Sequence, residues 1–261
     1  FGNIYKHNSK LASILYKNYI INLTTILKKL GININTVPVL DVLRKSTHKI
    51  IGKRSFSNNA LIVKKLGEMC VKIYKSNKIF TVIKHIPGHG CATSDSHLKT
   101  PRVNLSLKKL IAKDFLPFKS NSSLLGMTAH VVYSKIDSKN VATFSKKIIS
   151  EIIRKKIGFK GILISDDISM KALKFNLLTN AQKSLAAGCN IVLYCGGNSK
   201  DTLKLIKKIP FIRFIYKVKT LVYRACKIKK NYLFNRDFII FIIWIIFFII
   251  KILFKIIFKI F

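Results

Sequence analysis

Acidic residues are scarce in this 261-residue chain. Asp and Glu number 10 against 48 Lys and Arg, which gives a formal net charge of +38. Such a balance raises nucleic acid or an anionic membrane as partners. The lysines, however, are scattered among Ile, Asn, Phe and Tyr, and no basic run is interleaved with aromatics as in a nucleic-acid-binding module. We attribute the charge mainly to nucleotide bias, keep a basic binding surface as the alternative, and expect no nucleic-acid partner.

Paired cysteines are also lacking. The five cysteines are odd in number and form no C-x-x-C pair, which argues against both a disulfide framework and a zinc knuckle and favours a reducing compartment. The chain begins FGNIYKHNSK, without an initiator Met or the apolar run of a signal peptide. We therefore expect a cytoplasmic protein whose start is cut rather than targeted.

Short apolar runs recur along the chain, and each is unbroken rather than alternating, as in strands buried on both faces of a parallel sheet. Segments with helical spacing, such as 60–76 and 145–156, lie between them, and the second opens on a Ser cap. This alternation predicts an α/β fold, either a doubly wound sheet or a (β/α)₈ barrel. The five expected strands are 34–40, 80–85, 124–130, 161–166 and 190–195.

Polar residues at the strand ends favour the barrel, because the carboxyl ends of barrel strands converge on one mouth. These residues are Asp41, Lys84 with His85, His130, and Asp166 with Asp167. Five strands are too few to close a barrel. We therefore expect residues 1–210 to form a (β/α)₈ TIM barrel whose first strands are absent from this chain.

Residues 211–261 differ in composition and end in FIIFIIWIIFFIIKILFKIIFKIF. The uninterrupted apolar run 238–250 is shorter than the roughly 20 residues that span a membrane, although the lysines that follow could snorkel. Three interpretations stay open: a low-complexity or wrongly framed end, a membrane-seeking helix over 238–261, and an ordinary closing helix.

Asp166 and Asp167 follow an apolar strand directly, in the motif SDD. A carboxylate fixed at a strand end suits a nucleophile or a charge stabiliser. The alternative is that one of the two caps a helix starting near Ser169.

A second group of candidate site residues lies in the stretch KHIPGHGCATSDSH. Lys84 and His85 end a strand and offer cationic donors, whereas Asp95 and His97 lie two apart in a loop, where a carboxylate can orient an imidazole as general acid and base. The alternative for this pair is an ordinary surface contact. The His-x₃-His spacing of His85 and His89 suits a zinc helix, but the intervening Pro-Gly excludes that helix, so we expect no metal and no cofactor.

Together, KHIPGHGCATSDSH (84–97) and GILISDDISM (161–170) closely resemble glycoside hydrolase family 3, and within it the bacterial cytoplasmic β-N-acetylhexosaminidases of peptidoglycan recycling. The family pattern K-H-[FI]-P-G-H-G-x₄-D-S-H is matched at every stated position. Other segments look like that family's in the same order, among them INTVPVLDV, IGKRSF, DFLPF, MTAHVVY and AAGCNIVLYC. The resemblance stops near Pro210.

This resemblance implies a retaining mechanism with a covalent glycosyl-enzyme intermediate. Asp166 would be the nucleophile, His97 the acid and base, and Asp95 the dyad partner of His97. The hydroxyls of N-acetylglucosamine would be held by Arg54, Lys84 and His85. We expect Asp167 to face away and to begin a helix.

One departure from the family concerns the start of the barrel. Two strands normally precede the segment that 34–40 resembles, and the second ends in an acidic residue that binds the sugar, yet nothing here matches it. We therefore expect an open barrel edge and an incomplete sugar pocket, so that residues 1–261 alone fold poorly and turn over substrate weakly or not at all.

The expected function is that of a monomeric exo-β-N-acetylglucosaminidase that removes terminal GlcNAc from 1,6-anhydro-muropeptides. One alternative is another family-3 glycosidase such as a β-glucosidase, against which the DSH loop argues. The other is a non-enzymatic basic protein that binds nucleic acid or anionic membrane through its lysines and its C-terminal segment.

Overall fold

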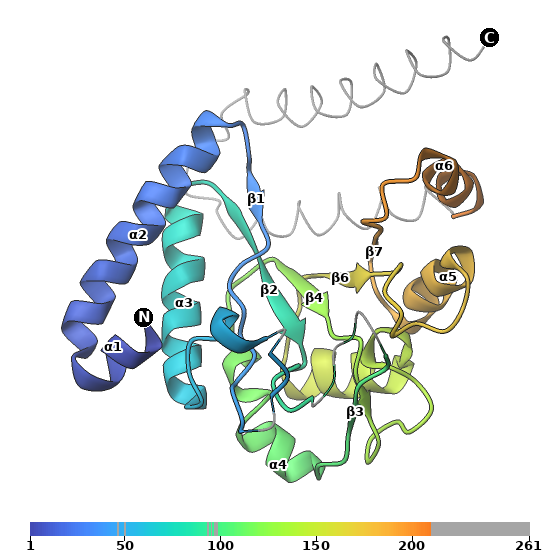
Figure 1. The fold of residues 1–261 in the computed structure, drawn as a ribbon, viewed down its shortest axis with the longest axis horizontal. Coiled ribbons are helices and arrows are strands. Elements are labelled where there is room, and N and C mark those ends of the chain that lie inside the picture. The colour runs from blue at the N-terminus through green and yellow to red at the C-terminus, as the bar shows by residue number, and fades with distance from the viewer. Residues whose placement is uncertain (46, 50, 93, 95, 97–98, 210–261) are drawn as a thin grey trace. The chain divides into compact units, whose positions relative to one another are not determined.

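Five parallel strands in the order β1-β2-β4-β6-β7 form the main sheet of the computed structural model (Figure 1). The structure describes residues 1–45, 47–49, 51–92, 94, 96 and 99–209. The sheet strands are β1 (Ile34–Asn35), β2 (Phe80–Ile86), β4 (Leu125–Thr128), β6 (Ile162–Asp167) and β7 (Ile191–Leu193). The α-helices are α1 (Gly2–His7), α2 (Ser9–Lys29), α3 (Ala60–Ser76), α4 (Leu107–Ala112), α5 (Leu177–Ala187) and α6 (Ser199–Lys208). The architecture is a parallel α/β half-barrel.

Shorter elements occupy the connections. The 3₁₀ turns are η1 (Gly52–Arg54), η2 (Leu116–Phe118) and η3 (Ala142–Phe144), and η4 (Ile148–Lys156) is a π-helix. Two short strands, β3 (Arg102–Val103) and β5 (Val132–Tyr133), pair in parallel with each other outside the main sheet.

Each of the five predicted runs overlaps one strand of the main sheet, so the parallel α/β prediction is confirmed. The first run forms the shortest strand, since regular pairing covers only Ile34 and Asn35. Pairing resumes around Pro38, whose carbonyl accepts the Lys84 N–H at 3.2 Å, and the Leu40 N–H returns a bond to the Lys84 carbonyl at 2.7 Å. Pro38 itself has no N–H to add to the ladder, which explains the interruption.

The predicted helix at 60–76 is α3, residue for residue, and it begins where the Asn59 side chain accepts the N–H groups of Leu61 and Ile62. In the segment 145–156, Ser145 accepts the Ile148 N–H at 3.1 Å, so the predicted Ser cap is confirmed. The helix there has π rather than α geometry.

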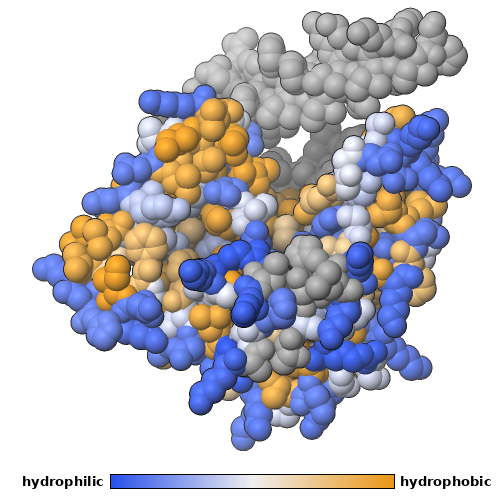
Figure 2. Space-filling view, in the orientation of Figure 1, coloured by the Kyte–Doolittle hydropathy of each residue, from blue (hydrophilic) through white to orange (hydrophobic). Residues whose placement is uncertain are grey.

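Helix α2 was not among the predicted helices. Its buried residues recur every fourth position (Ala12, Tyr16, Ile20, Thr24) and face α3, which runs beside it in Figure 1. Large apolar side chains are also exposed on its outer face, and Figure 2 shows orange surface in this region. They are Leu11, Ile14, Leu15, Tyr19 and Ile26. Exposed lysines and asparagines lie among them (Lys10, Lys17, Asn18, Asn22), so no clear amphipathic pattern identifies the helix from the sequence.

The prediction that a helix starts near Ser169 is wrong. Turns occupy the residues that follow β6, and the next helix, α5, begins only at Leu177, where Asn176 accepts the Thr179 N–H at 3.0 Å. Asn176 directly precedes the first helical residue, and its side chain accepts an N–H of the first turn, so it is the residue that caps this helix.

In the described part of the chain, no helix has both the length and the apolar character to cross a membrane. The three interpretations of 211–261, including membrane contact through 238–261, concern residues outside that part.

Candidate active site

The carboxyl ends of the sheet strands bring four predicted polar residues together. Asp41 follows the β1 segment, His85 lies near the end of β2, His130 follows β4, and Asp166 lies near the end of β6. All four are buried. His85 contacts both Asp41 and Asp166, and His130 contacts the Asp167 carbonyl, so the strand ends meet at one edge of the sheet as predicted.

Asp41 and His85 form the tightest contact of this group. The Asp41 Oδ2 atom lies 2.6 Å from the His85 Nδ1 atom, and Oδ1 accepts the backbone N–H of His85 at 3.3 Å. Burial raises the pKa of Asp41, but the adjacent His85 ring and the His89 N–H lower it more in sum. The pKa of Asp41 therefore lies below its usual value, and the carboxylate is ionised.

Asp166, near the end of β6, faces the His85 ring, which is carried by β2, two strands away in the sheet. Its Oδ2 atom lies 3.9 Å from the His85 Nε2 atom, and its Oδ1 accepts the N–H of Asp167 at 2.9 Å. Burial raises the pKa of Asp166, whereas His85, His130 and the Asp167 N–H together lower it below the ordinary value. The side chain is 12% exposed. Asp166 is thus an ionised carboxylate with a narrow opening to solvent.

Asp167 makes structural contacts. Its side chain accepts the Ser169 N–H at 3.0 Å, the Ser169 hydroxyl at 2.6 Å and the Cys195 N–H at 3.0 Å. These bonds fix the turn after β6 and tie it to the end of β7. Its expected role in structure is confirmed, although it closes a turn instead of beginning a helix.

His130 is held by both ring nitrogens. Its Nε2 atom lies 3.0 Å from the Asp167 carbonyl, which can only accept, so Nε2 carries the hydrogen. Its Nδ1 atom lies 2.7 Å from the Thr143 hydroxyl. Burial lowers the pKa of His130, which keeps the ring neutral.

His89 has no hydrogen bond to either ring nitrogen among the described residues, although it is only 2% exposed. Its backbone N–H donates to Asp41 Oδ1 at 2.6 Å. Burial lowers the pKa of His89 to about 4, helped by His85. The backbone of His89 therefore braces this loop against Asp41.

Two glycines allow this loop to pack closely. A Cβ atom on Gly90 would lie 2.0 Å from the Val42 carbonyl oxygen, and one on Gly88 would lie 2.6 Å from the Asp114 carbonyl oxygen. The Tyr133 hydroxyl donates to the Gly88 carbonyl at 2.6 Å. The PGHG motif thus owes its glycines to contact with neighbouring backbone.

Lys84 lies near the buried carboxylates and near Arg54. The Lys84 ammonium donates to the Thr36 hydroxyl at 3.3 Å. Burial and the nearby Arg54 guanidinium lower the pKa of Lys84, while Asp166 and Asp41 act in the opposite direction. Lys84 therefore lies within electrostatic reach of both Asp166 and Arg54.

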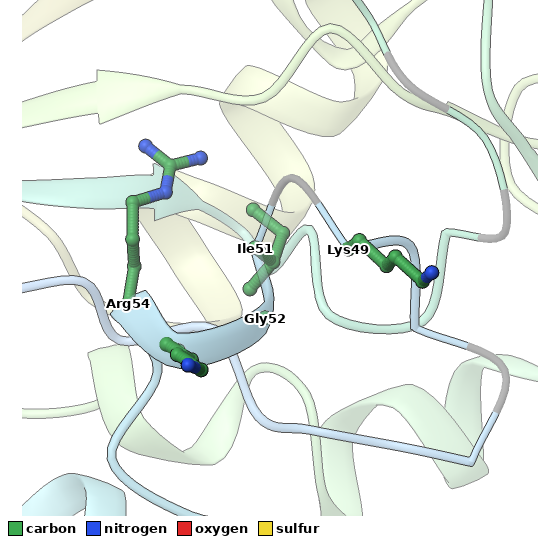
Figure 3. A pocket seen from close by; sticks show the side chains of 5 residues that line it. Lys49, Ile51, Gly52 and Arg54 are labelled. Atoms are coloured by element: carbon green, nitrogen blue, oxygen red, sulfur yellow. The ribbon is translucent and has the colours of Figure 1, made fainter.

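Arg54 also borders a hollow of ≈ 500 Å³ that is lined by Lys49, Ile51, Gly52 and Lys53. In Figure 3 the Arg54 side chain points away from Lys49, and Ile51 lies between them. The hollow is thus lined by two lysines and one arginine, with no acidic residue among its lining side chains.

Asp95 and His97 lie outside the described residues. The described residues of the same loop reach the segment that follows Asp166: the Ala172 N–H donates to the Ser96 carbonyl at 3.0 Å, and the Thr100 hydroxyl donates to the Ala172 carbonyl at 2.7 Å.

Sequence reasoning named Asp41 as a strand-end residue but gave it no role. Its signal was available, because Asp41 is one of 10 acidic residues and follows the apolar run VPVL.

The described residues contain no group of three or more His, Cys, Asp or Glu side chains that could hold a metal ion. What the arrangement offers is an ionised carboxylate beside an imidazole, with an ammonium group within electrostatic reach. This combination can attack an electrophilic carbon while donors bind hydroxyl groups.

Comparison with known proteins identifies the family of this chain. The glycosyl hydrolase family 3 N terminal domain matches residues 11–212. The chain is 35% identical over 208 residues to a beta-hexosaminidase of Nitrosomonas eutropha, covering 77% of this chain and 59% of that protein. It is 39% identical over 178 residues to a beta-hexosaminidase of Neisseria meningitidis, covering 66% of this chain and 49% of that protein.

A solved structure is similar as well. The crystal structure of NagZ from Neisseria gonorrhoeae in complex with N-trifluoroacetyl-D-glucosamine superposes with a TM-score of 0.68 and 34% sequence identity, covering 75% of this chain and 57% of that one. The chain thus spans about half the length of the relatives it matches. By the extent of the family match and by its sheet, the chain belongs to glycosyl hydrolase family 3 and carries its N-terminal domain.

Proposed function

We propose that this chain carries the catalytic centre of a retaining exo-β-N-acetylglucosaminidase. The observation that carries the proposal is Asp166, an ionised and nearly buried carboxylate at the end of β6 that faces the His85 ring at 3.9 Å. Relatives named beta-hexosaminidase and a similar structure that binds an N-acylated glucosamine support the substrate class.

In the first step, an Asp166 oxygen attacks the anomeric carbon, and the bond from that carbon to the leaving oxygen breaks. His97, oriented by Asp95, gives its proton to the leaving oxygen. In the second step, water attacks the same carbon and gives its proton to His97, and the bond to Asp166 breaks. Two displacements at one carbon return the product in its original configuration.

Sugar binding falls to Arg54, Lys84 and His85. The three side chains offer guanidinium, ammonium and imidazole groups. In support, Arg54 lowers the pKa of Lys84, Asp166 raises it, and His85 lowers the pKa of Asp166. The guanidinium and ammonium groups can donate to hydroxyl groups of N-acetylglucosamine, and a ring nitrogen of His85 can accept from one.

We propose further that the sheet belongs to a (β/α)₈ barrel. Eight strands close such a barrel, and the main sheet of the described residues has five parallel ones. The natural glycan would be a muropeptide derived from peptidoglycan, acted on by a monomer in the cytoplasm. In support of a reducing compartment, Cys70, Cys91, Cys189 and Cys195 are free thiols.

The test compares hydrolysis of an aryl β-N-acetylglucosaminide with that of an aryl β-glucoside. It uses the 261-residue chain and a chimera completed by the segments of the Nitrosomonas eutropha relative outside the match. We expect release from the N-acetylated substrate and a β-anomer as the first sugar product by NMR. An α-anomer, or preference for the glucoside, would contradict the proposal.

Asp166→Asn should lower the rate by about 10³-fold or more, because the amide oxygen is a poor nucleophile. The matched control is Asp167→Asn, which removes a carboxylate one residue along that serves a turn. The control should lose stability but keep most of its activity per folded molecule. Equal rates in the two variants would show that Asp166 is not the nucleophile.

A further inference from the structure

Asp41 uses both carboxylate oxygens on one segment of the chain. Oδ1 accepts the backbone N–H of His89 at 2.6 Å and that of His85 at 3.3 Å, and Oδ2 lies 2.6 Å from His85 Nδ1. The side chain is 0% exposed. An ionised carboxylate can only accept hydrogen bonds, so the His85 N–H, the His89 N–H and His85 Nδ1 must all be donors in these contacts.

The hydrogen of the contact between Asp41 and His85 must consequently lie on Nδ1. In the neutral ring this leaves Nε2 with a lone pair. Nε2 is 3.9 Å from Asp166 Oδ2, beyond hydrogen-bond distance, so the two atoms do not satisfy each other. Both side chains keep some exposure, 7% for His85 and 12% for Asp166. The lone pair thus faces the place where a substrate would meet the nucleophile.

We propose that Asp41 is a positioning residue of this site: it fixes the His85 ring in the form with hydrogen on Nδ1, so that Nε2 accepts a hydroxyl hydrogen of the sugar. The inference rests on the proposed glycosidase function for its substrate. It predicts selectivity for a sugar with a free hydroxyl at the position that meets His85, because a methyl ether or a deoxy position there has no hydrogen to donate.

The surrounding charges are consistent with this role. The groups that face the His85 ring are Asp41 from the β1 segment, Asp166 from β6 and the His89 ring at 5.7 Å between centroids. Lys84 precedes it on β2, and His130 acts on Asp166 from beyond β4. Asp41 stays ionised at neutral pH because its pKa lies below the ordinary value.

His130 provides an internal control. Its Nε2 donates to a carbonyl, so its neutral ring carries the hydrogen on Nε2, opposite to the form inferred for His85. One molecule therefore should contain both neutral forms of histidine at the same site. Long-range proton–nitrogen NMR correlations distinguish the two forms directly.

The experiment records these spectra for the full chain at pH 8, with His85 and His130 assigned by His85→Gln and His130→Gln. We expect hydrogen on Nδ1 of His85 and on Nε2 of His130. A His85 ring whose only hydrogen is on Nε2, or one that carries both hydrogens, overturns the proposal. This measurement needs no variant at Asp41 and no activity.

The second arm uses Asp41→Asn, whose amide oxygen can still accept the His89 N–H while its NH₂ group donates to His85 Nδ1. We expect the hydrogen to move to Nε2 and kcat/KM of the chimera to fall by about 10²-fold or more. If the ring keeps its hydrogen on Nδ1, or if kcat/KM stays within about twofold, Asp41 is not a positioning residue.

Asp114→Asn is the matched control, since Asp114 is another fully buried carboxylate but pairs with Arg44. It should lower stability and leave the His85 form unchanged. The two proposals fail separately: the expected ring form without hydrolysis by any version would sink the function alone, whereas hydrolysis with hydrogen on His85 Nε2 would sink this inference alone.

Discussion

At the scale of single residues, Asp166 is ionised where burial alone would favour its neutral form. The imidazoles of His85 and His130 and the Asp167 N–H reverse the effect of burial on its pKa. A nucleophilic carboxylate needs this charge, and a nearly closed environment strengthens its interaction with a developing positive charge on the sugar. If the backbone moved at these strand ends, the imidazoles would no longer lower the pKa of Asp166. The ionisation of Asp166 therefore depends on the strands that hold His85 and His130 in place.

His89 makes a prediction about stability against pH. Its folded pKa is about 4, whereas an unfolded histidine titrates near 6.5. The unfolded chain therefore binds more protons between these values, so the contribution of His89 to stability is present above pH 6.5 and is lost as the pH falls toward 4. At pH 5 the loss should be roughly 2 kcal/mol relative to pH 7.5.

Urea denaturation at pH 7.5 and pH 5 measures this loss in the wild type and in His89→Gln. The variant should lose less stability on acidification, and the loss that remains includes His130, whose pKa is also lowered by burial. Identical losses in the two proteins would show that His89 is not buried in its neutral form.

The positions of Asp166 and His85 were predictable, because each lies near the end of a buried strand. The pairing of Asp41 with His85 was not, because these residues are 44 positions apart and come together only when β1 and β2 pair. The nucleophile, dyad and sugar-binding roles remain predictions, and Asp95 and His97 lie outside the described residues.

At the scale of elements, the loop after β2 is held by backbone contact. Gly90→Ala would push a methyl group into the Val42 carbonyl, 2.0 Å away, and should lower the free energy of unfolding by about 1–3 kcal/mol. Because the same loop supplies the N–H that Asp41 accepts, the variant should also weaken sugar binding.

Gly158→Ala is the control for this substitution. Gly158 has φ of +77° but nothing within 4 Å of the added Cβ, so it reports backbone strain without a steric contact. Denaturation curves should show a smaller loss, about 1 kcal/mol. A Gly90→Ala protein as stable as Gly158→Ala would contradict the close packing of the loop.

The prediction of elements succeeded for the buried strands and for α3, where periodicity and caps agree. It missed α2, whose exposed face mixes apolar side chains with lysine and asparagine, so that no clear amphipathic pattern marks the helix. It also placed a helix at Ser169, because a turn closed by Asp167 uses the same Asx contact as a helix cap.

At the scale of the whole molecule, the main sheet has edges at β1 and β7 among the described residues. Apolar side chains are exposed beside the first edge, including Ile32, Ile34 and Phe80, in addition to the outer face of α2. Exposed strand edges and apolar patches favour association. Strands that close the proposed barrel would pair with the two sheet edges.

We therefore predict that the chimera is more stable and more active than the 261-residue chain. The expected differences are a higher urea midpoint, less association in sedimentation experiments, and faster hydrolysis of the aryl β-N-acetylglucosaminide. A chain that is monomeric, equally stable and equally active on its own would contradict the need for further strands.

The central claim is that Asp166 forms a covalent bond to the sugar. An N-acetylglucosaminyl donor with a very good leaving group, quenched in acid within one turnover, should leave the chimera heavier by one N-acetylglucosaminyl residue. Peptide mass spectrometry should locate that residue on Asp166 and find none in Asp166→Asn. A label on another residue, or hydrolysis without any covalent intermediate and with inversion, would contradict the account.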